Sequence, residues 1–240
     1  MSLIKSWSYT RLVDFEQCPY KAKLKYVDRI PEEKSTAADR GTAIHQLAED
    51  YVAGKMTQLP HELAKFSNEF LALRTQYDAG KVSLEGEWGF DHDWNPCEYR
   101  SAWARIKADS MTFKTSDHVV VVDYKTGKRY GNELKHGEQV QLYSIAALIR
   151  NPQVQQITSE LWYLDIDDLH KITYTRAQAL KYLPQFEKRA LAVTTADKFP
   201  PRPNVFACKY CPFGPAKGGQ CEYGVLPGDT AMSQYRRKYG

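Results

Sequence analysis

The segment "VVVVDYKTGK", Val119–Lys128, constrains the fold of this chain more than any other stretch. Four consecutive valines predict a strand that is buried on both faces, because β-branched side chains fit a pleated surface covered on either side. The strand then meets Asp123 and Lys125, two charged residues at the end of a dry core. Successive strand side chains point to opposite faces, so we expect Asp123 and Lys125 to share one face and Tyr124 to point away.

The composition is that of an ordinary globular chain, with 240 residues, 42% of them hydrophobic and 26% charged. This length suffices for one sizeable domain with its own core. No apolar run approaches the roughly 20 residues of a membrane span, and the N-terminus lacks the apolar region of a signal peptide, so we expect no membrane association and a cytoplasmic location. The net charge of +4 permits a polyanionic partner without requiring one.

The periodicity of apolar residues predicts alternating helices and strands. Four helices are predicted from apolar residues at helical spacing. The first follows an N-cap at Ser8 or Thr10, and the second is "GTAIHQLAEDYVAG", which ends at Gly54. The others are Leu63–Tyr77 and "EQVQLYSIAALI". Strands are predicted in "EGEWGFD", in the hairpin formed by "YRSAWARIKADSMTF" and "HVVVVDYK", and in "ITSELWYLDI" and "HKITYT". Thr175 and Gln178 predict a capping box for a helix from about Arg176, which Pro184 would kink. "KFPPRPNVF" is expected to be an extended connector. Strands between helices indicate an α/β layer fold.

The hairpin could bring a second acid to Asp123. Asp109 lies on the preceding strand and reaches the same face if the register is favourable. Two carboxylates held together repel, and a hard divalent cation such as magnesium or manganese removes that repulsion. Lys125 would then orient a metal-bound water and stabilise charge on a phosphate. The alternative is a simple strand-end ion pair, since an isolated D-x-K triplet is common by chance.

Four further residues are weaker candidates for the same site. Gln139 and Tyr143 stand four apart and so share one face of the following helix. His45 borders the apolar stripe of the earlier helix, where a lone histidine is more often a core or surface residue than a ligand. Glu87 is a further candidate, and is equally well explained as a surface residue.

Three of the five cysteines cluster in "CKYCPFGPAKGGQC", at Cys208, Cys211 and Cys221. In a cytosolic chain such a cluster indicates a metal site rather than disulfides. Closed structural sites generally use four ligands, so a fourth is expected elsewhere. Cys97 has no partner nearby in the sequence and is expected to be a plain thiol.

"GTAIH", "ARIKAD", "VDYKTG" and "QVQLY", in that order, resemble the RecB-like nuclease branch of the PD-(D/E)XK superfamily, which includes the CRISPR-associated adaptation nucleases. The match extends from "SYTRLVDFEQCP" to the final cysteine, and a phage-encoded origin fits it. The resemblance implies an α/β, restriction-endonuclease-like core with a mixed central sheet flanked by helices. One departure is visible, because many members carry glycine shortly before the first aspartate, where this chain has Ala104 and Ala108.

The resemblance also assigns roles to the residues. It implies that the catalytic metal is bound by the side chains of His45, Asp109 and Asp123 and by the carbonyl of Tyr124. Lys125 would be the catalytic lysine. Gln139 and Tyr143 would form the Q-x-x-x-Y element near the substrate.

For the cysteines, the resemblance implies that Cys18 joins Cys208, Cys211 and Cys221 around a 4Fe–4S cluster that links the two chain ends. Nine residues separate Cys211 from Cys221, a wider gap than is common in the family, which leaves structural zinc as the alternative. The expected organisation is a single nuclease domain over residues 1–240. Residues 1–35 and 196–240 would form the metal-cluster subdomain, and residues 85–165 the catalytic core sheet and helix.

The implied function is a magnesium- or manganese-dependent DNA nuclease that hydrolyses phosphodiester bonds, as an exonuclease, in recombination, repair or phage DNA processing. No G-x-x-x-x-G-K-[ST] element is present, so ATP-driven translocation would require a separate helicase or recombination protein. The alternative is a non-catalytic DNA-binding module that keeps the fold and the metal cluster as a scaffold. Cleavage polarity, strand preference and the choice of DNA over RNA stay open at this level.

Overall fold

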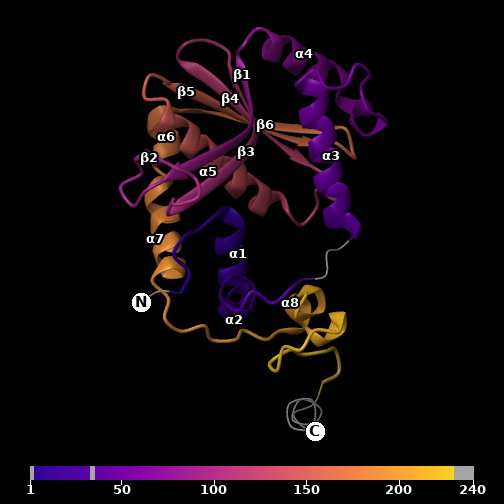
Figure 1. Cartoon of the computed structure of the whole chain (residues 1–240), viewed down its shortest axis with the longest axis vertical. Helices are drawn as coiled ribbons and strands as arrows, with labels where there is room; N and C mark the ends of the chain where they lie inside the picture. Colours follow the sequence, from indigo (N-terminus) through magenta and orange to yellow (C-terminus); the bar gives the residue numbers. More distant parts are fainter. Residues whose placement is uncertain (1–2, 33–35, 230–240) are drawn as a thin grey trace. The chain divides into compact units, whose positions relative to one another are not determined.

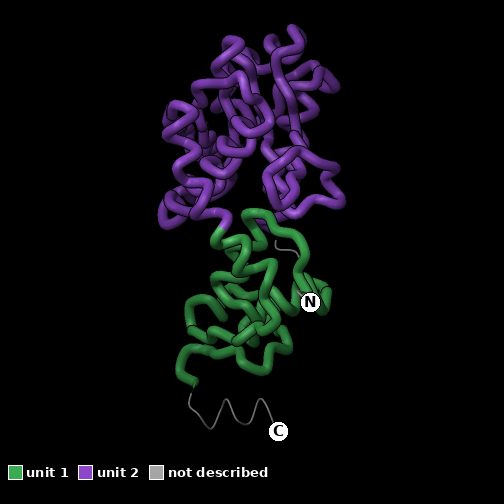
Figure 2. The backbone as a smooth tube through the Cα atoms, turned by 90° about the vertical axis from the view of Figure 1, so that its left-hand side faces the viewer, with its two compact units in different colours: residues 1–34, 188–240 green, residues 35–187 purple. Residues whose placement is uncertain are grey.

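The computed structural model describes residues 3–32 and 36–229, which fall into two compact units (Figure 2). Residues 35–187 form one unit, called here the core unit. Residues 1–34 and 188–240 form the other, called here the terminal unit because it contains both chain ends. The boundary falls within helix α7, Leu183–Thr194.

The core unit is built on a six-stranded sheet in the order β2-β1-β3-β4-β5-β6 (Figure 1). Only β4 and β5 pair in parallel, and the other neighbours are antiparallel, so the sheet is mixed as expected. This sheet, with helices on its faces, confirms the α/β, restriction-endonuclease-like fold class. The strands are β1 Val82–Phe90, β2 Pro96–Cys97, β3 Ala104–Phe113, β4 His118–Lys125, β5 Gln156–Tyr163 and β6 Asp168–Thr175.

The four valines of β4 are buried and divide between the two faces of the sheet. Val120, Val122 and Tyr124 belong to one apolar cluster with α3 (Thr36–Val52), a 3₁₀ turn (His61–Phe66) and α4 (Ser67–Asp78). Tyr124 therefore points away from the face of Asp123 and Lys125, as strand alternation predicts.

Helix α5, Glu133–Arg150, connects β4 to β5 and packs on β3, β4 and β5. A parallel strand pair requires such a crossover connection. The polypeptide leaves β4 at Lys125 and enters α5 eight residues later, so the end of the valine strand and the first turns of α5 lie at one end of the sheet.

Two helix predictions need correction. The predicted helix Leu63–Tyr77 is instead a 3₁₀ turn followed by α4, because Phe66 leaves helical geometry at φ −113° and ψ 32°. Pro184 does not kink a continuous helix. The chain breaks after α6, Arg176–Leu180, and Pro184 lies in the first turn of α7, where a missing N–H costs nothing. The capping box of Thr175 and Gln178 is confirmed.

The terminal unit contains short helices around a small core. They are α1 Tyr9–Gln17, α2 Pro19–Ala22, a π-helical turn Lys23–Val27, α8 Val205–Tyr210 and a 3₁₀ turn Pro215–Lys217. Ser8 caps α1 by accepting the Arg11 N–H at 3.4 Å. Ile4, Ala22 and Val193 form its buried centre. In the part of the chain that is described, every helix is too short or too polar to cross a membrane.

Candidate active site and cysteine centre

Three carboxylates stand in a row across adjacent strands of the core unit. Ser110 pairs with Val122 across β3 and β4, and one step further this register places Asp109 opposite Asp123. Across β1 and β3, Leu84 pairs with Ser110 and Gly86 with Ala108, which places Glu85 opposite Asp109. Like charges held directly opposite one another destabilise a sheet unless a cation lies between them.

Asp109 is the centre of this row and is held on both oxygens. Its Oδ1 lies 3.1 Å from His45 Nδ1, and its Oδ2 accepts the Tyr124 backbone N–H at 2.6 Å. Burial disfavours a charged His45, but the hydrogen bond and charge of Asp109 outweigh burial and raise the pKa of the imidazole. His45, on α3, thus reaches the sheet through a partner 64 positions away in the sequence.

Glu85 was not predicted, and it completes a potential metal site. One ligand atom each from His45, Glu85 and Asp109 lie within 4.8 Å of one another. Carboxylate oxygens and an imidazole suit magnesium or manganese, so these residues fit a hard divalent cation. Glu87, the predicted candidate, is not in this trio.

The backbone of Glu85 supports a special role for this position. Its φ of +46° lies in the left-handed region, which costs a non-glycine residue of order 1–3 kcal/mol. Such outliers persist where the surrounding structure fixes them, often at functional sites. Lys107, on β3, forms an ion pair with the Glu85 carboxylate. The Glu85 carboxylate, paired with the Lys107 ammonium group, therefore lies beside Asp109.

Asp123 is almost completely buried, with 2% of its surface exposed. Burial, together with the neighbouring Asp109, raises the pKa of Asp123 to about 6, against the opposing effect of Lys125. Lys125 Nζ lies 2.6 Å from Asp123 Oδ2, yet this buried oxygen has no well-aligned hydrogen bond. A buried carboxylate oxygen that lacks a full set of donors can accept a cation.

Gln139 and Tyr143 extend the network from Lys125 along α5. Lys125 Nζ donates to Gln139 Oε1 at 2.9 Å, and Gln139 Nε2 donates to the Tyr143 hydroxyl at 2.6 Å. Burial and the nearby Asp123 and Asp109 carboxylates raise the pKa of Tyr143 well above its usual value, so the phenol stays neutral. The side-chain oxygen of Gln139 therefore fixes the position of the Lys125 ammonium group.

An open cleft gives access to the trio of His45, Glu85 and Asp109 and to Tyr143. Glycine at position 41 lets α3 come close to the end of β4, since a Cβ there would lie 3.2 Å from Thr126 Oγ1. The cleft is lined by Gly41, Thr42, His45, Gln46, Glu49, Glu85, Glu87, Lys107, Asp109 and Tyr143. The structure thus brings together the side chains of the predicted site residues His45, Asp109, Asp123, Lys125, Gln139 and Tyr143. Tyr124 contributes its backbone N–H, and the predicted coordination by its carbonyl stays a prediction.

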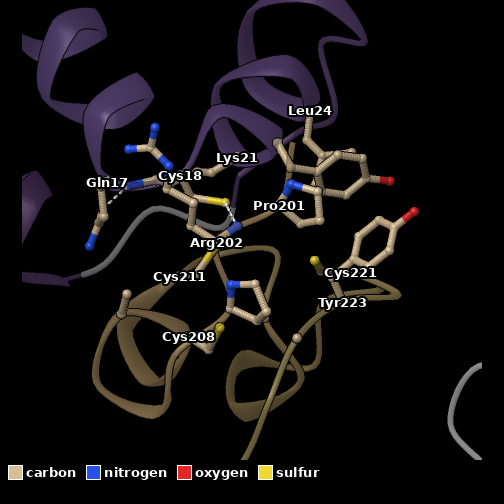
Figure 3. Close-up of a pocket in the computed structure, with 15 residues that line it drawn as sticks. Gln17, Cys18, Lys21, Leu24, Pro201, Arg202, Cys208, Cys211, Cys221 and Tyr223 are labelled. Carbon is tan, nitrogen blue, oxygen red and sulfur yellow. Dashed lines mark hydrogen bonds between the residues drawn. The ribbon is translucent and has the colours of Figure 1, made fainter. Parts of the chain in front are cut away.

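Four of the five cysteines line one pocket of the terminal unit (Figure 3). They are Cys18, Cys208, Cys211 and Cys221, and the Cys18 sulfur accepts the Arg202 N–H at 3.4 Å. Burial raises the pKa of the Cys211 and Cys221 thiols, and the neighbouring cysteines act in the same direction. Cys97 lies in the core unit and is exposed.

The four cysteines of this pocket supply the number of ligands that closed structural metal sites use. Thiolate ligands suit zinc and iron–sulfur clusters alike, so the residues fit either kind of centre.

Comparison with known proteins places this chain in a family. The family model described as the PD-(D/E)XK nuclease superfamily matches residues 6–216. Among solved structures, a protein from Eubacterium rectale to which exonuclease activity is ascribed is similar, with a TM-score of 0.50 and 17% identity over 86% of each chain. This likeness concerns the fold.

Two structures of an alkaline exonuclease from Laribacter hongkongensis are also similar, each at 13% identity over 80% of this chain. The first covers 88% of the exonuclease chain at a TM-score of 0.34. The second, in complex with dAMP, covers 87% at 0.42. A search of the curated proteins found no match.

Proposed function

We propose that this chain, which belongs to the PD-(D/E)XK nuclease superfamily, is a magnesium- or manganese-dependent deoxyribonuclease that acts on DNA ends. Family membership supports a nuclease, and the dependence on a metal, the DNA substrate and the exonuclease mode are our proposal. The observation that carries it is the row of Glu85, Asp109 and Asp123, with His45 beside Asp109 and Lys125 beside Asp123.

The proposed metal ligands are His45, Glu85, Asp109 and Asp123, with the Tyr124 carbonyl as a further ligand. A divalent cation bound there would lower the pKa of a water molecule and neutralise charge on a phosphate. His45 must bind as the neutral imidazole, so the proton that Asp109 favours has to leave the ring when the cation binds.

Lys125 would act on the reacting phosphate from its position beside Asp123. Its ammonium group stabilises negative charge that develops on the phosphate oxygens during hydrolysis. Asp123 and Gln139 hold Nζ at 2.6 Å and 2.9 Å, so the charge is already in place before the substrate arrives. Tyr143 then fixes the amide of Gln139 and thereby acts as a positioning residue.

In the terminal unit, we propose that Cys18, Cys208, Cys211 and Cys221 bind a 4Fe–4S cluster, as in the RecB-like branch of the superfamily. Four cysteines that line one pocket support this proposal, with structural zinc as the alternative. In this proposal residues 1–35 and 196–240 act as the metal-cluster subdomain and residues 85–165 as the catalytic core.

The biological setting that best suits this chemistry is DNA recombination, repair or phage DNA processing in the cytoplasm. A nuclease with no ATP-binding motif in its sequence would depend on a separate helicase or recombination protein for unwinding. The partners proposed are therefore DNA and such a motor protein.

Incubation with end-labelled linear DNA and with covalently closed circular DNA tests the proposal. Each substrate is mixed with magnesium, manganese or excess chelator. We expect progressive loss of linear DNA with either metal, little loss of circles, and no cleavage with chelator. Rapid nicking of circles would indicate an endonuclease instead. DNA binding without any cleavage, by protein with its metal sites loaded, would indicate a non-catalytic DNA-binding module.

A further inference from the structure

We infer that helix α8 of the terminal unit carries a stacking surface for unpaired bases, formed by Phe206 and Tyr210. This inference rests on the proposed function and specifies its substrate as DNA with a single-stranded segment. It concerns residues far from the carboxylate row in the sequence, and it can fail while the nuclease assignment stands.

The two rings are exposed together on one face of α8. Phe206 is 83% exposed and Tyr210 70% exposed, and residues four apart lie one above the other on a helix. Ala207 and Cys208 face the other way and line the cysteine pocket. One side of α8 therefore faces the cysteine pocket, and the side with the two rings faces solvent. Two exposed rings on one helix face form a contiguous apolar patch, the kind of surface feature that marks binding sites.

The helix itself is held at both ends. Asn204 caps it by accepting the Ala207 N–H at 2.8 Å, and the Cys211 N–H donates to the Cys208 carbonyl at 3.3 Å. The platform is therefore presented on a fixed backbone, although α8 has only six residues. A rigid aromatic surface loses little conformational entropy when a ligand stacks on it.

The charge of the terminal unit selects a polyanion as the occupant. Its described residues, 3–32 and 188–229, contain 12 Lys and Arg against 7 Asp and Glu, a net charge of +5. The core unit contains 17 against 21, a net charge of −4. Among the described residues, the excess of positive charge thus lies in the unit that carries the two exposed rings. Lys209, between them in the sequence, places Nζ 5.4 Å from the centroid of the Tyr210 ring.

Aromatic rings beside basic groups bind single strands, because every base has a flat face and every nucleotide a phosphate. Duplex DNA offers the phosphates but hides the base faces inside the stack. The rings should therefore contribute to the binding of single strands and of duplexes with overhangs, and the basic residues to the binding of all DNA.

Fluorescence anisotropy with a labelled single strand and the matching duplex tests this surface. Chelator and the Lys125→Ala background keep the DNA intact. We expect Phe206→Ala and Tyr210→Ala each to weaken single-strand binding roughly fivefold or more, and to change duplex binding by less than about twofold. Phe206→Trp should retain single-strand affinity, whereas Phe206→Leu, which is apolar without a ring face, should lose as much as Phe206→Ala.

The matched control is Tyr182→Ala, at a tyrosine of the core unit that is 39% exposed. It should leave both affinities unchanged, and equal metal content of all variants shows that the cysteine pocket is intact. The inference is overturned if the α8 variants bind the single strand as tightly as the parent, or if they lose single-strand and duplex affinity equally. Neither result would affect metal-dependent cleavage of linear DNA by the wild type, so failure here is distinguishable from failure of the proposed function.

Discussion

Lys125 Nζ lies 2.6 Å from the buried Oδ2 of Asp123, and the two side chains extend from one face of a strand whose preceding residues are four valines. The valines fix the backbone from both sides of the sheet, so the two charges cannot move apart without disturbing the core. A charge pair on a rigid strand keeps its geometry better than one on a loop. This relationship determines the first prediction.

Lys125→Ala should lower the rate of DNA cleavage by roughly 100-fold or more, because it removes a positive charge aimed at the developing phosphate charge. DNA affinity should stay within a few-fold, since many basic residues share the phosphate contacts. Initial rates at saturating magnesium and anisotropy measurements on the same preparations check both statements. Lys128→Ala, at an exposed lysine three residues later, is the control and should cleave normally. Equal rates for Lys125→Ala and wild type would exclude the proposed role of Lys125.

Glu85→Gln should weaken binding of manganese by roughly tenfold or more, because it removes one charged ligand from the trio with His45 and Asp109. Glu87→Gln is the matched control, since Glu87 lies two residues along the same strand and outside the trio. Calorimetric titration of each variant with manganese measures the difference. If the two variants bind manganese equally, Glu85 is not a ligand, and its left-handed backbone has another cause.

The sequence alone could not show that Glu85, and not Glu87, belongs to the metal trio. Alternation along a strand gives both glutamates the same face, so periodicity cannot choose between them. The choice depends on the β1–β3 register and on a left-handed backbone at a non-glycine residue, and both are tertiary features. Asp109, Asp123 and Lys125 were accessible to prediction because one short hairpin relates them. Helical periodicity places His45 at the edge of an apolar stripe but says nothing of its partner on β3.

The same distinction holds for the fold. The valine strand, the hairpin and the capping box at Thr175 follow from local patterns, and the structure confirms them. The break between α6 and α7 was not predicted, because a proline is compatible both with a kink and with the first turn of a new helix.

Asp14→Asn should destabilise the protein at pH 7 and have a smaller effect at pH 3. Burial opposes the charged form of Asp14, but Lys21 at 2.7 Å, the Tyr26 hydroxyl at 2.6 Å and Lys25 at 3.3 Å outweigh burial and lower the pKa of the carboxyl. A folded-state pKa below the unfolded value of 3.8 means that the stabilisation is present above about pH 4 and is lost as the pH falls through the folded-state value.

We expect a loss of about 1–3 kcal/mol at pH 7, measured by urea unfolding of metal-stripped protein. Asp28→Asn is the control, because Asp28 pairs with Lys23 in a more exposed setting and should cost less than about 1 kcal/mol. An Asp14→Asn effect of the same size at pH 3 and pH 7 would show that packing, and not charge, explains the loss.

Cys18→Ser should remove the metal centre and lower the melting temperature, whereas Cys97→Ser should change neither. Cys18 and Cys208 are 190 positions apart and line the same pocket, so a shared centre closes most of the chain into a loop. Closing a long loop restricts the unfolded chain, and a metal that binds only the folded arrangement adds its binding free energy to folding.

Wild-type protein purified without oxygen should be brown, contain iron and absorb near ~400 nm, as thiolate-bound iron–sulfur clusters do. Absorbance, metal analysis and melting curves of the three proteins measure this directly. A colourless wild type with stoichiometric zinc would correct the identity of the metal but keep the link between the chain ends; unchanged metal content in Cys18→Ser would show that Cys18 is not a ligand.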